Sequence, residues 1–131
     1  MNIAVDTNIL VRAVVGDDAQ QADAATGLMG RAKMLAIAIP CLCELVWILR
    51  SVYGFQSPDI SRAIRALVAA ENVETNRPAV EAGLAMLEAG GDFADGVIAY
   101  EGRWLGAETF VSFDKEAVEM LRAQGQAARL L

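Results

Sequence analysis

The chain has 131 residues, of which 17 are acidic, 11 are basic and none is histidine, and this length allows one globular domain with a core but not two. Without histidine, Ser-His-Asp catalysis, Cys-His catalysis and histidine-based zinc sites are excluded, so any catalytic chemistry has to come from carboxylates. The net charge of -6 argues against a simple basic face for nucleic acid, and a nucleic-acid substrate would need another source of positive charge.

The predicted elements are short apolar strands that alternate with longer segments of helical periodicity. The first half of the chain reads as a strand at 2–5, a short helix entered through Asp6, a helix within 17–33 capped by Asp17 or Asp18, a strand at 34–39 stopped by Pro40, and a helix at 41–54. The second half reads as a helix through Ala70 that Ser57 caps and Pro58 opens, a strand at 72–75, a helix from Pro78 to Ala89, a helix at 92–106, a strand at 108–113, a helix from Asp114 to Gln124, and a fifth strand at 126–131. This order favours an α/β fold. We expect one domain over residues 1–131, a three-layer sandwich whose mostly parallel central sheet has four to five strands and is covered by helices on both sides.

The apolar content and the cysteines bear on location and partners. Apolar residues make up 55% of the chain, more than is usual in soluble proteins, so some apolar surface is expected to be left for a partner. No apolar stretch is long enough to span a bilayer, and the start of the sequence lacks the order of a signal peptide, which predicts a cytoplasmic protein. Cys41 and Cys43 are too close in sequence for an ordinary disulfide and are predicted to be reduced core residues.

Two aspartates follow predicted strands directly. Asp6 comes after the apolar run "IAV", and Asp114 comes after "FVSF". Because α/β sheets bind their ligands at the carboxyl ends of the strands, both side chains are candidates for a site at that edge. Each also has a plain structural interpretation, Asp6 as an Asx turn or helix cap and Asp114 as a helix cap.

Another pair of aspartates opens the predicted helix at 92–106. Asp92 and Asp95 lie about one turn apart, where like charges repel unless something positive lies between them. They either cap the helix or hold a cation. For Asp92 capping alone is the better interpretation, because its D-x-x-D spacing only partly resembles a capping box.

Glu44 stands in an otherwise apolar stretch, "LAIAIPCLCELVWIL", in which only Pro40 shares its non-apolar character. A buried, unpaired carboxylate is costly unless it is protonated, paired or bound to a metal. The segment therefore predicts a buried Glu44 for which an external cation is an economical partner. For the aromatic residues Trp47, Tyr53, Phe55 and Trp104, packing in the core is the default expectation, with partner contact as the alternative.

Four motifs occur in one order along the chain, "AVDTNILVRAV", "CLCELVWILRSVYG", "GGDFADGVIAYEG" and "TFVSFDKEAV". Together they make the whole chain resemble the PIN-domain family, and more closely the VapC-type toxins of bacterial toxin-antitoxin pairs. The resemblance implies that Asp6, Glu44 and Asp95 are metal ligands, that Asp114 is a fourth acidic position, and that Asp92 is an acid only some members carry. Asn8 and Ser112 match polar positions that support the ligands. Gly96 stands where alanine is commoner in the family.

The resemblance and the carboxylates together predict a metal-dependent endoribonuclease. Oxygen ligands suit Mg²⁺ or Mn²⁺, and an ion held by Asp6, Glu44 and Asp95, with Asp114 placing a second ion or a water, would activate water without a histidine base. The resemblance also implies a VapB-like antitoxin, pairing of toxin subunits as a homodimer, and RNA, such as tRNA, as substrate. No membrane partner is expected.

Two other functions fit parts of the pattern. A catalytically silent binding module would have the same fold with the acids as caps, and would not bind metal. A phosphatase of the haloacid-dehalogenase type also uses an aspartate after its first strand, but needs a second aspartate two positions on, where this chain has Asn8.

Overall fold

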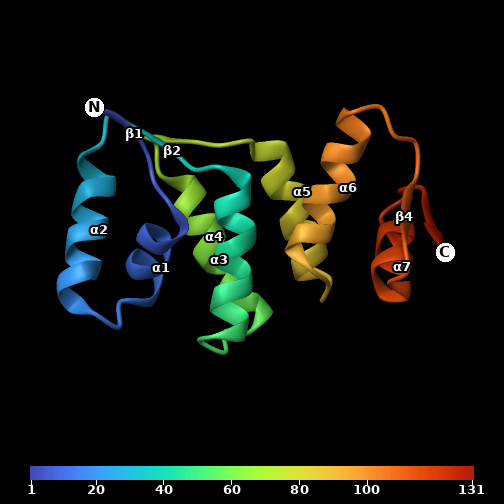
Figure 1. Ribbon diagram of the computed structural model, residues 1–131, viewed down its shortest axis with the longest axis horizontal. Coiled ribbons are helices and arrows are strands. Elements are labelled where there is room, and N and C mark those ends of the chain that lie inside the picture. Colours follow the sequence, from blue (N-terminus) through green and yellow to red (C-terminus); the bar gives the residue numbers. More distant parts are fainter. The chain divides into compact units, whose positions relative to one another are not determined.

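The computed structural model describes all residues, 1–131 (Figure 1). Its elements in the first part of the chain are β1 (Asn2–Ala4), α1 (Thr7–Val15), α2 (Ala19–Arg31), β2 (Met34–Ala36), α3 (Ile39–Ser51), α4 (Ser57–Ala69) and β3 (Val73–Glu74). They are followed by α5 (Arg77–Glu88), α6 (Phe93–Trp104), β4 (Phe110–Ser112), α7 (Lys115–Ala123) and β5 (Ala128–Leu130). The chain divides into two compact units, Met1–Asn76 and Arg77–Leu131, and each is described by itself.

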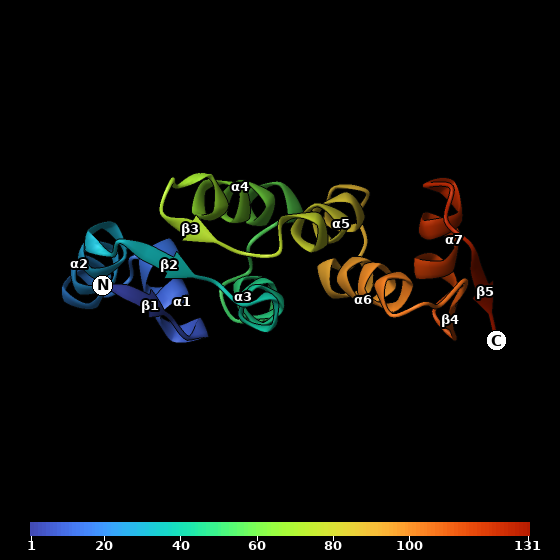
Figure 2. The ribbon, with the colours of Figure 1, turned by 90° about the horizontal axis from the view of Figure 1, so that it is seen from above.

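The first unit is built on a three-stranded parallel sheet in the order β1-β2-β3. The register pairs Ile3 with Leu35, and Leu35 in turn with Val73. Around this sheet, α1 packs against both α2 and α3, and α3 packs against α4, an arrangement that can be followed from above in Figure 2. Because the strands are parallel, the loops that lead into α1 and α3 both leave from the same edge of the sheet.

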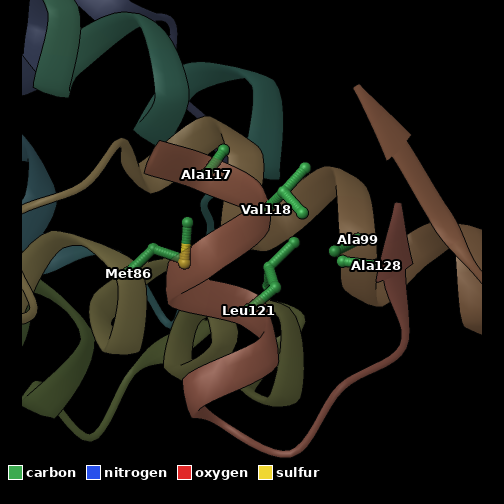
Figure 3. Packing of buried hydrophobic residues seen from close by; sticks show 6 residues of the cluster. All are labelled: Met86, Ala99, Ala117, Val118, Leu121 and Ala128. Atoms are coloured by element: carbon green, nitrogen blue, oxygen red, sulfur yellow. The ribbon is translucent and has the colours of Figure 1, made fainter. Parts of the chain in front are cut away.

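The second unit consists of the helix pair α5 and α6 and a two-stranded parallel sheet of β4 and β5, against which α7 packs. Its core includes a cluster of buried side chains drawn from α5, α6, α7 and β5 (Figure 3). The members are Met86, Ala99, Ala117, Val118, Leu121 and Ala128. Apolar positions of α7 at spacings of three and four residues supply one face of this cluster, as expected for an amphipathic helix.

Gly96 and Gly83 let α5 and α6 approach closely. A Cβ atom on Gly96 would lie 2.3 Å from the backbone oxygen of Ala82, and one on Gly83 would lie 2.6 Å from the ring of Phe93. A contact with a backbone oxygen cannot be relieved by a side-chain rotation, so the helix pair has no room for a methyl group at Gly96. This explains why this chain carries glycine where alanine is commoner in the family that its sequence resembles.

The predicted α/β class is confirmed, with seven helices and five strands paired in parallel. The strands form a three-stranded sheet and a separate two-stranded sheet, whereas the sequence predicted one central sheet. The expectation of a single domain over 1–131 stays a prediction. No helix combines the length and apolar character needed to cross a membrane.

Two predicted boundaries are wrong. Pro40 lies in the first turn of α3 and does not stop a strand, which is physically reasonable because a first-turn residue has no helical partner for its amide. Ser57 is the first residue of α4, and its N-cap is Gln56, which makes no side-chain cap. The Ser57 hydroxyl instead accepts a hydrogen bond from the Arg50 guanidinium at 2.9 Å.

Candidate carboxylate site

Asp6 joins β1 to α1 and caps the helix. Its backbone is extended, with φ -89° and ψ 176°, and its Oδ1 accepts a hydrogen bond from the backbone N–H of Ile9 at 3.1 Å. The cap interpretation of Asp6 is therefore confirmed. The side chain is exposed, so capping with one carboxylate oxygen does not withdraw the group from other ligands.

Glu44 lies on the exposed side of α3, so the prediction that it is buried is wrong. The buried positions of α3 are Leu42, Leu45, Val46 and Leu49. They repeat at spacings of three and four residues and form one stripe that excludes Glu44. Its Oε2 accepts a hydrogen bond from the Thr7 hydroxyl at 2.9 Å, so the carboxylate is also not unpaired. The desolvation argument for a cation at Glu44 therefore no longer holds. Glu44 still lies beside the β1–α1 junction, where its carboxylate is bonded to Thr7.

The cysteines lie close to this junction and form no disulfide. Both are outside any disulfide and half-buried, which confirms that they are not bonded to one another and corrects the expectation of full core burial. The thiol of Cys41 donates a weak hydrogen bond to the backbone oxygen of Val5, with sulfur and oxygen 3.6 Å apart. This contact joins the first turn of α3 to the residue that precedes Asp6.

In the second unit, Asp92 and Asp95 have different structural roles. Asp92 is the N-cap of α6, and its Oδ1 accepts a hydrogen bond from the backbone N–H of Ala94 at 3.1 Å. Asp95 lies in the first turn of the same helix, half-buried, and does not cap it. Burial raises the pKa of Asp95 above its usual value, and the nearby charges of Asp92 and Asp114 raise this pKa further. The helix therefore holds Asp95 where a negative charge is disfavoured.

Asp114 caps α7, as one of the two sequence interpretations predicted. Its Oδ1 accepts a hydrogen bond from the backbone N–H of Ala117 at 3.2 Å. The hydroxyl of Ser112 accepts a hydrogen bond from the backbone N–H of Asp114 at 2.9 Å, and so fixes the turn that leads from β4 into the helix. Asp114 is exposed.

The predicted site residues thus fall into two groups. Glu44 belongs with Asp6 in the first unit, where the Thr7 hydroxyl joins the start of α1 to Glu44, and Asp95 belongs with Asp92 and Asp114 in the second, where their charges interact. No three Asp, Glu or Cys side chains come together in an arrangement that could hold a metal ion. All four predicted ligands are nonetheless carboxylates, the donor type that Mg²⁺ prefers. Their assignment to one metal site stays a prediction.

Thr7 is the residue near the site that sequence reasoning missed. The signal in the sequence was a hydroxyl directly after Asp6, but its partner lies 37 positions away. Trp47 and Trp104 also depart from expectation, since 66% and 80% of these side chains are exposed where core packing was the default. Tyr53 and Phe55 are half-buried.

The family model described as "PIN domain" matches residues 3–122 of the chain. The match spans all of the predicted ligands, and the chain belongs to the PIN-domain family. PIN domains are generally nucleases, so the family supports a nuclease function for this protein. No curated protein matches the chain.

Proposed function

We propose that this protein is a metal-dependent endoribonuclease and the toxin of a VapBC-type toxin-antitoxin pair. The family supports nuclease activity, and the absence of histidine leaves carboxylates as the groups that can promote it. The observation that carries the proposal is the match to the PIN-domain family over residues 3–122. Asp95 is consistent with it, because burial and the charges of Asp92 and Asp114 raise the pKa of this carboxyl. A bound cation would reverse that penalty, because an opposite charge nearby favours the ionised carboxylate.

Each carboxylate has a role in this mechanism. Asp6, Glu44 and Asp95 would hold Mg²⁺ or Mn²⁺, and Asp114 would place a second ion or a water. When bound, such an ion polarises the scissile phosphate and lowers the pKa of the attacking water. The bound ions would also supply the positive charge for RNA that the composition of the chain lacks.

A binding module without activity is the second candidate, because Asp6, Asp92 and Asp114 all cap helices. Asp95 is the residue that this alternative leaves unexplained, since it caps nothing and carries a raised pKa. The phosphatase alternative has no support, because the chain belongs to the PIN-domain family.

Divalent metal is expected to raise the melting temperature of the protein. A ligand that binds only the folded state at a hundred times its dissociation constant stabilises that state by about 2.7 kcal/mol. Calorimetric titration and thermal melts with Mg²⁺ and Mn²⁺ measure this, with metal-free buffer containing EDTA as the reference for the melts. If the titration shows no heat of binding and the melting temperature does not change, the inactive binding module becomes the better explanation.

The proposed partners are a small antitoxin and a second toxin subunit. Trp47 and Val52 of the α3 region are 66% and 64% exposed, close after Glu44, and they offer apolar surface for a partner helix. An arginine from the antitoxin could then pair with the carboxylates and displace the metal.

Co-expression with the product of the neighbouring gene tests this pairing. We expect a stable complex without nuclease activity, and a free toxin that is dimeric by light scattering and harmful when expressed alone. The pairing would be refuted if the protein is monomeric, is tolerated by the cell and does not bind the product of the neighbouring gene. The nuclease proposal would still stand.

A further inference from the structure

We propose that Thr7 is a positioning residue that orients the carboxylate of Glu44 for the metal. This inference rests on the proposed function. Its starting observation is the hydrogen bond from the Thr7 hydroxyl to Oε2 of Glu44, at 2.9 Å, which joins the first residue of α1 to the second turn of α3.

The burial of the two side chains differs, and this difference indicates which of them orients the other. Thr7 is 8% exposed, whereas Glu44 is exposed. A buried hydroxyl needs a partner, and a β-branched side chain has few rotamers, so Thr7 is held in place by its surroundings. Glu44 is long, flexible and solvated, and it would otherwise sample many orientations. Thr7 is therefore the fixed partner and Glu44 the one that is oriented.

The backbone around this bond is also held. Asp6, the residue before Thr7, caps α1 through the backbone N–H of Ile9 at 3.1 Å. On the other side, the Cys41 thiol contacts the backbone oxygen of Val5 at 3.6 Å, in the turn of α3 that precedes Glu44. The Thr7–Glu44 bond thus spans two segments whose separation is already fixed, which makes the orientation of the carboxylate reproducible.

The bond uses one of the two carboxylate oxygens. The Thr7 hydroxyl takes one lone pair of Oε2, so Oε1 is the oxygen of Glu44 that keeps both lone pairs for a cation. Hydrogen-bonded partners of ligating carboxylates hold them in orientation, and losing such a partner typically weakens metal affinity by about 10- to 100-fold. The same loss is expected when the Thr7 hydroxyl is removed.

Mn²⁺ affinity of Thr7 variants, measured by calorimetry on the metal-free full chain, tests this role. Thr7→Val removes the hydroxyl and keeps the shape, and we expect it to weaken Mn²⁺ binding by about 10- to 100-fold. Thr7→Ser keeps the donor and should bind nearly as the parent does. Thr26→Val is the matched control, because it removes a hydroxyl that bonds only within α2, to the backbone oxygens of Ala22 and Asp23.

The melting temperature of the metal-free variants separates positioning from a merely structural role. Thr7→Val leaves behind an exposed carboxylate that water can solvate, so the variant should melt close to the parent. If Thr7→Val does not fold, Thr7→Ala removes the same donor and decides the matter by its Mn²⁺ affinity.

Three results would overturn the inference. Parent-like Mn²⁺ binding by Thr7→Val or Thr7→Ala would do so while leaving the proposed function intact. A fall in metal-free melting temperature without rescue of binding by Thr7→Ser would mean that Thr7 is merely structural. Failure of the parent itself to bind Mn²⁺ would remove the proposed function and this inference together.

Discussion

Replacing Asp95 by asparagine is expected to abolish RNA cleavage and leave α6 folded. Asparagine keeps the size of the side chain but loses the negative charge that would hold the metal. The helix does not need Asp95 as a cap, because Asp92 accepts the hydrogen bond from Ala94. The measurement is the cleavage rate of RNA with Mg²⁺, compared with the parent at equal protein concentration.

Asp92→Asn is the matched control, because it makes the same substitution at the N-cap of the same helix, three residues before Asp95. Asparagine caps a helix about as well as aspartate, so this variant should fold normally and lose much less activity. If Asp95→Asn cleaves RNA as fast as the parent, Asp95 is not a ligand and the proposed site is wrong.

The same Asp95 variant should also be more stable than the parent without metal, in a pH-dependent way. Burial and the charges of Asp92 and Asp114 raise the pKa of Asp95 in the folded state, so folding disfavours its charged form. The penalty is absent below the ordinary pKa of 3.8, grows as pH rises from 3.8 to the raised pKa, and is fully present above the raised pKa. Urea unfolding of both proteins across this range should show the variant's advantage only at the higher pH values.

Glu44→Gln and Asp6→Asn are each expected to abolish cleavage as well. Glutamine still offers an oxygen to the Thr7 hydroxyl, and asparagine still caps α1 through the N–H of Ile9, so both local structures persist. Only the negative charge is lost in each case. Cleavage assays with circular dichroism of the same samples measure activity and fold together.

Glu71→Gln serves as the control for these two changes, because Glu71 is an exposed acid of the same unit that belongs to no predicted site. It should cleave RNA like the parent. Full activity in Glu44→Gln would show that Glu44 interacts only with Thr7, and full activity in Asp6→Asn would show that Asp6 is only a cap.

Local signals explain why so much of the fold could be predicted. Strands such as β1 and β4 are short apolar runs, and the helices that follow them begin at the capping aspartates Asp6 and Asp114. The division of the strands into two sheets could not be predicted in this way, because strand pairing is a tertiary property. The boundary at Pro40 was misplaced for a different reason, since proline is accepted both after a strand and in the first turn of a helix.

The candidate site was predictable by residue type more than by environment. The capping roles of Asp92 and Asp114 follow from their position before an apolar helix. Glu44 was expected to be buried because its segment is apolar, but the composition of a segment does not say which face of the helix packs. The partnership of Glu44 with Thr7 could not be seen, because it depends on how α1 and α3 pack.

Incubating the purified protein with total RNA and with tRNA, in Mg²⁺ or in EDTA, tests the nuclease proposal most directly. Asp95→Asn, purified in the same way, reports any cleavage by a contaminating ribonuclease. We predict that the parent cleaves RNA in Mg²⁺, that EDTA stops the reaction, and that the variant is inactive under both conditions. Cleavage that persists in EDTA, or that is equal in parent and variant, would contradict a carboxylate-held metal as the source of the activity.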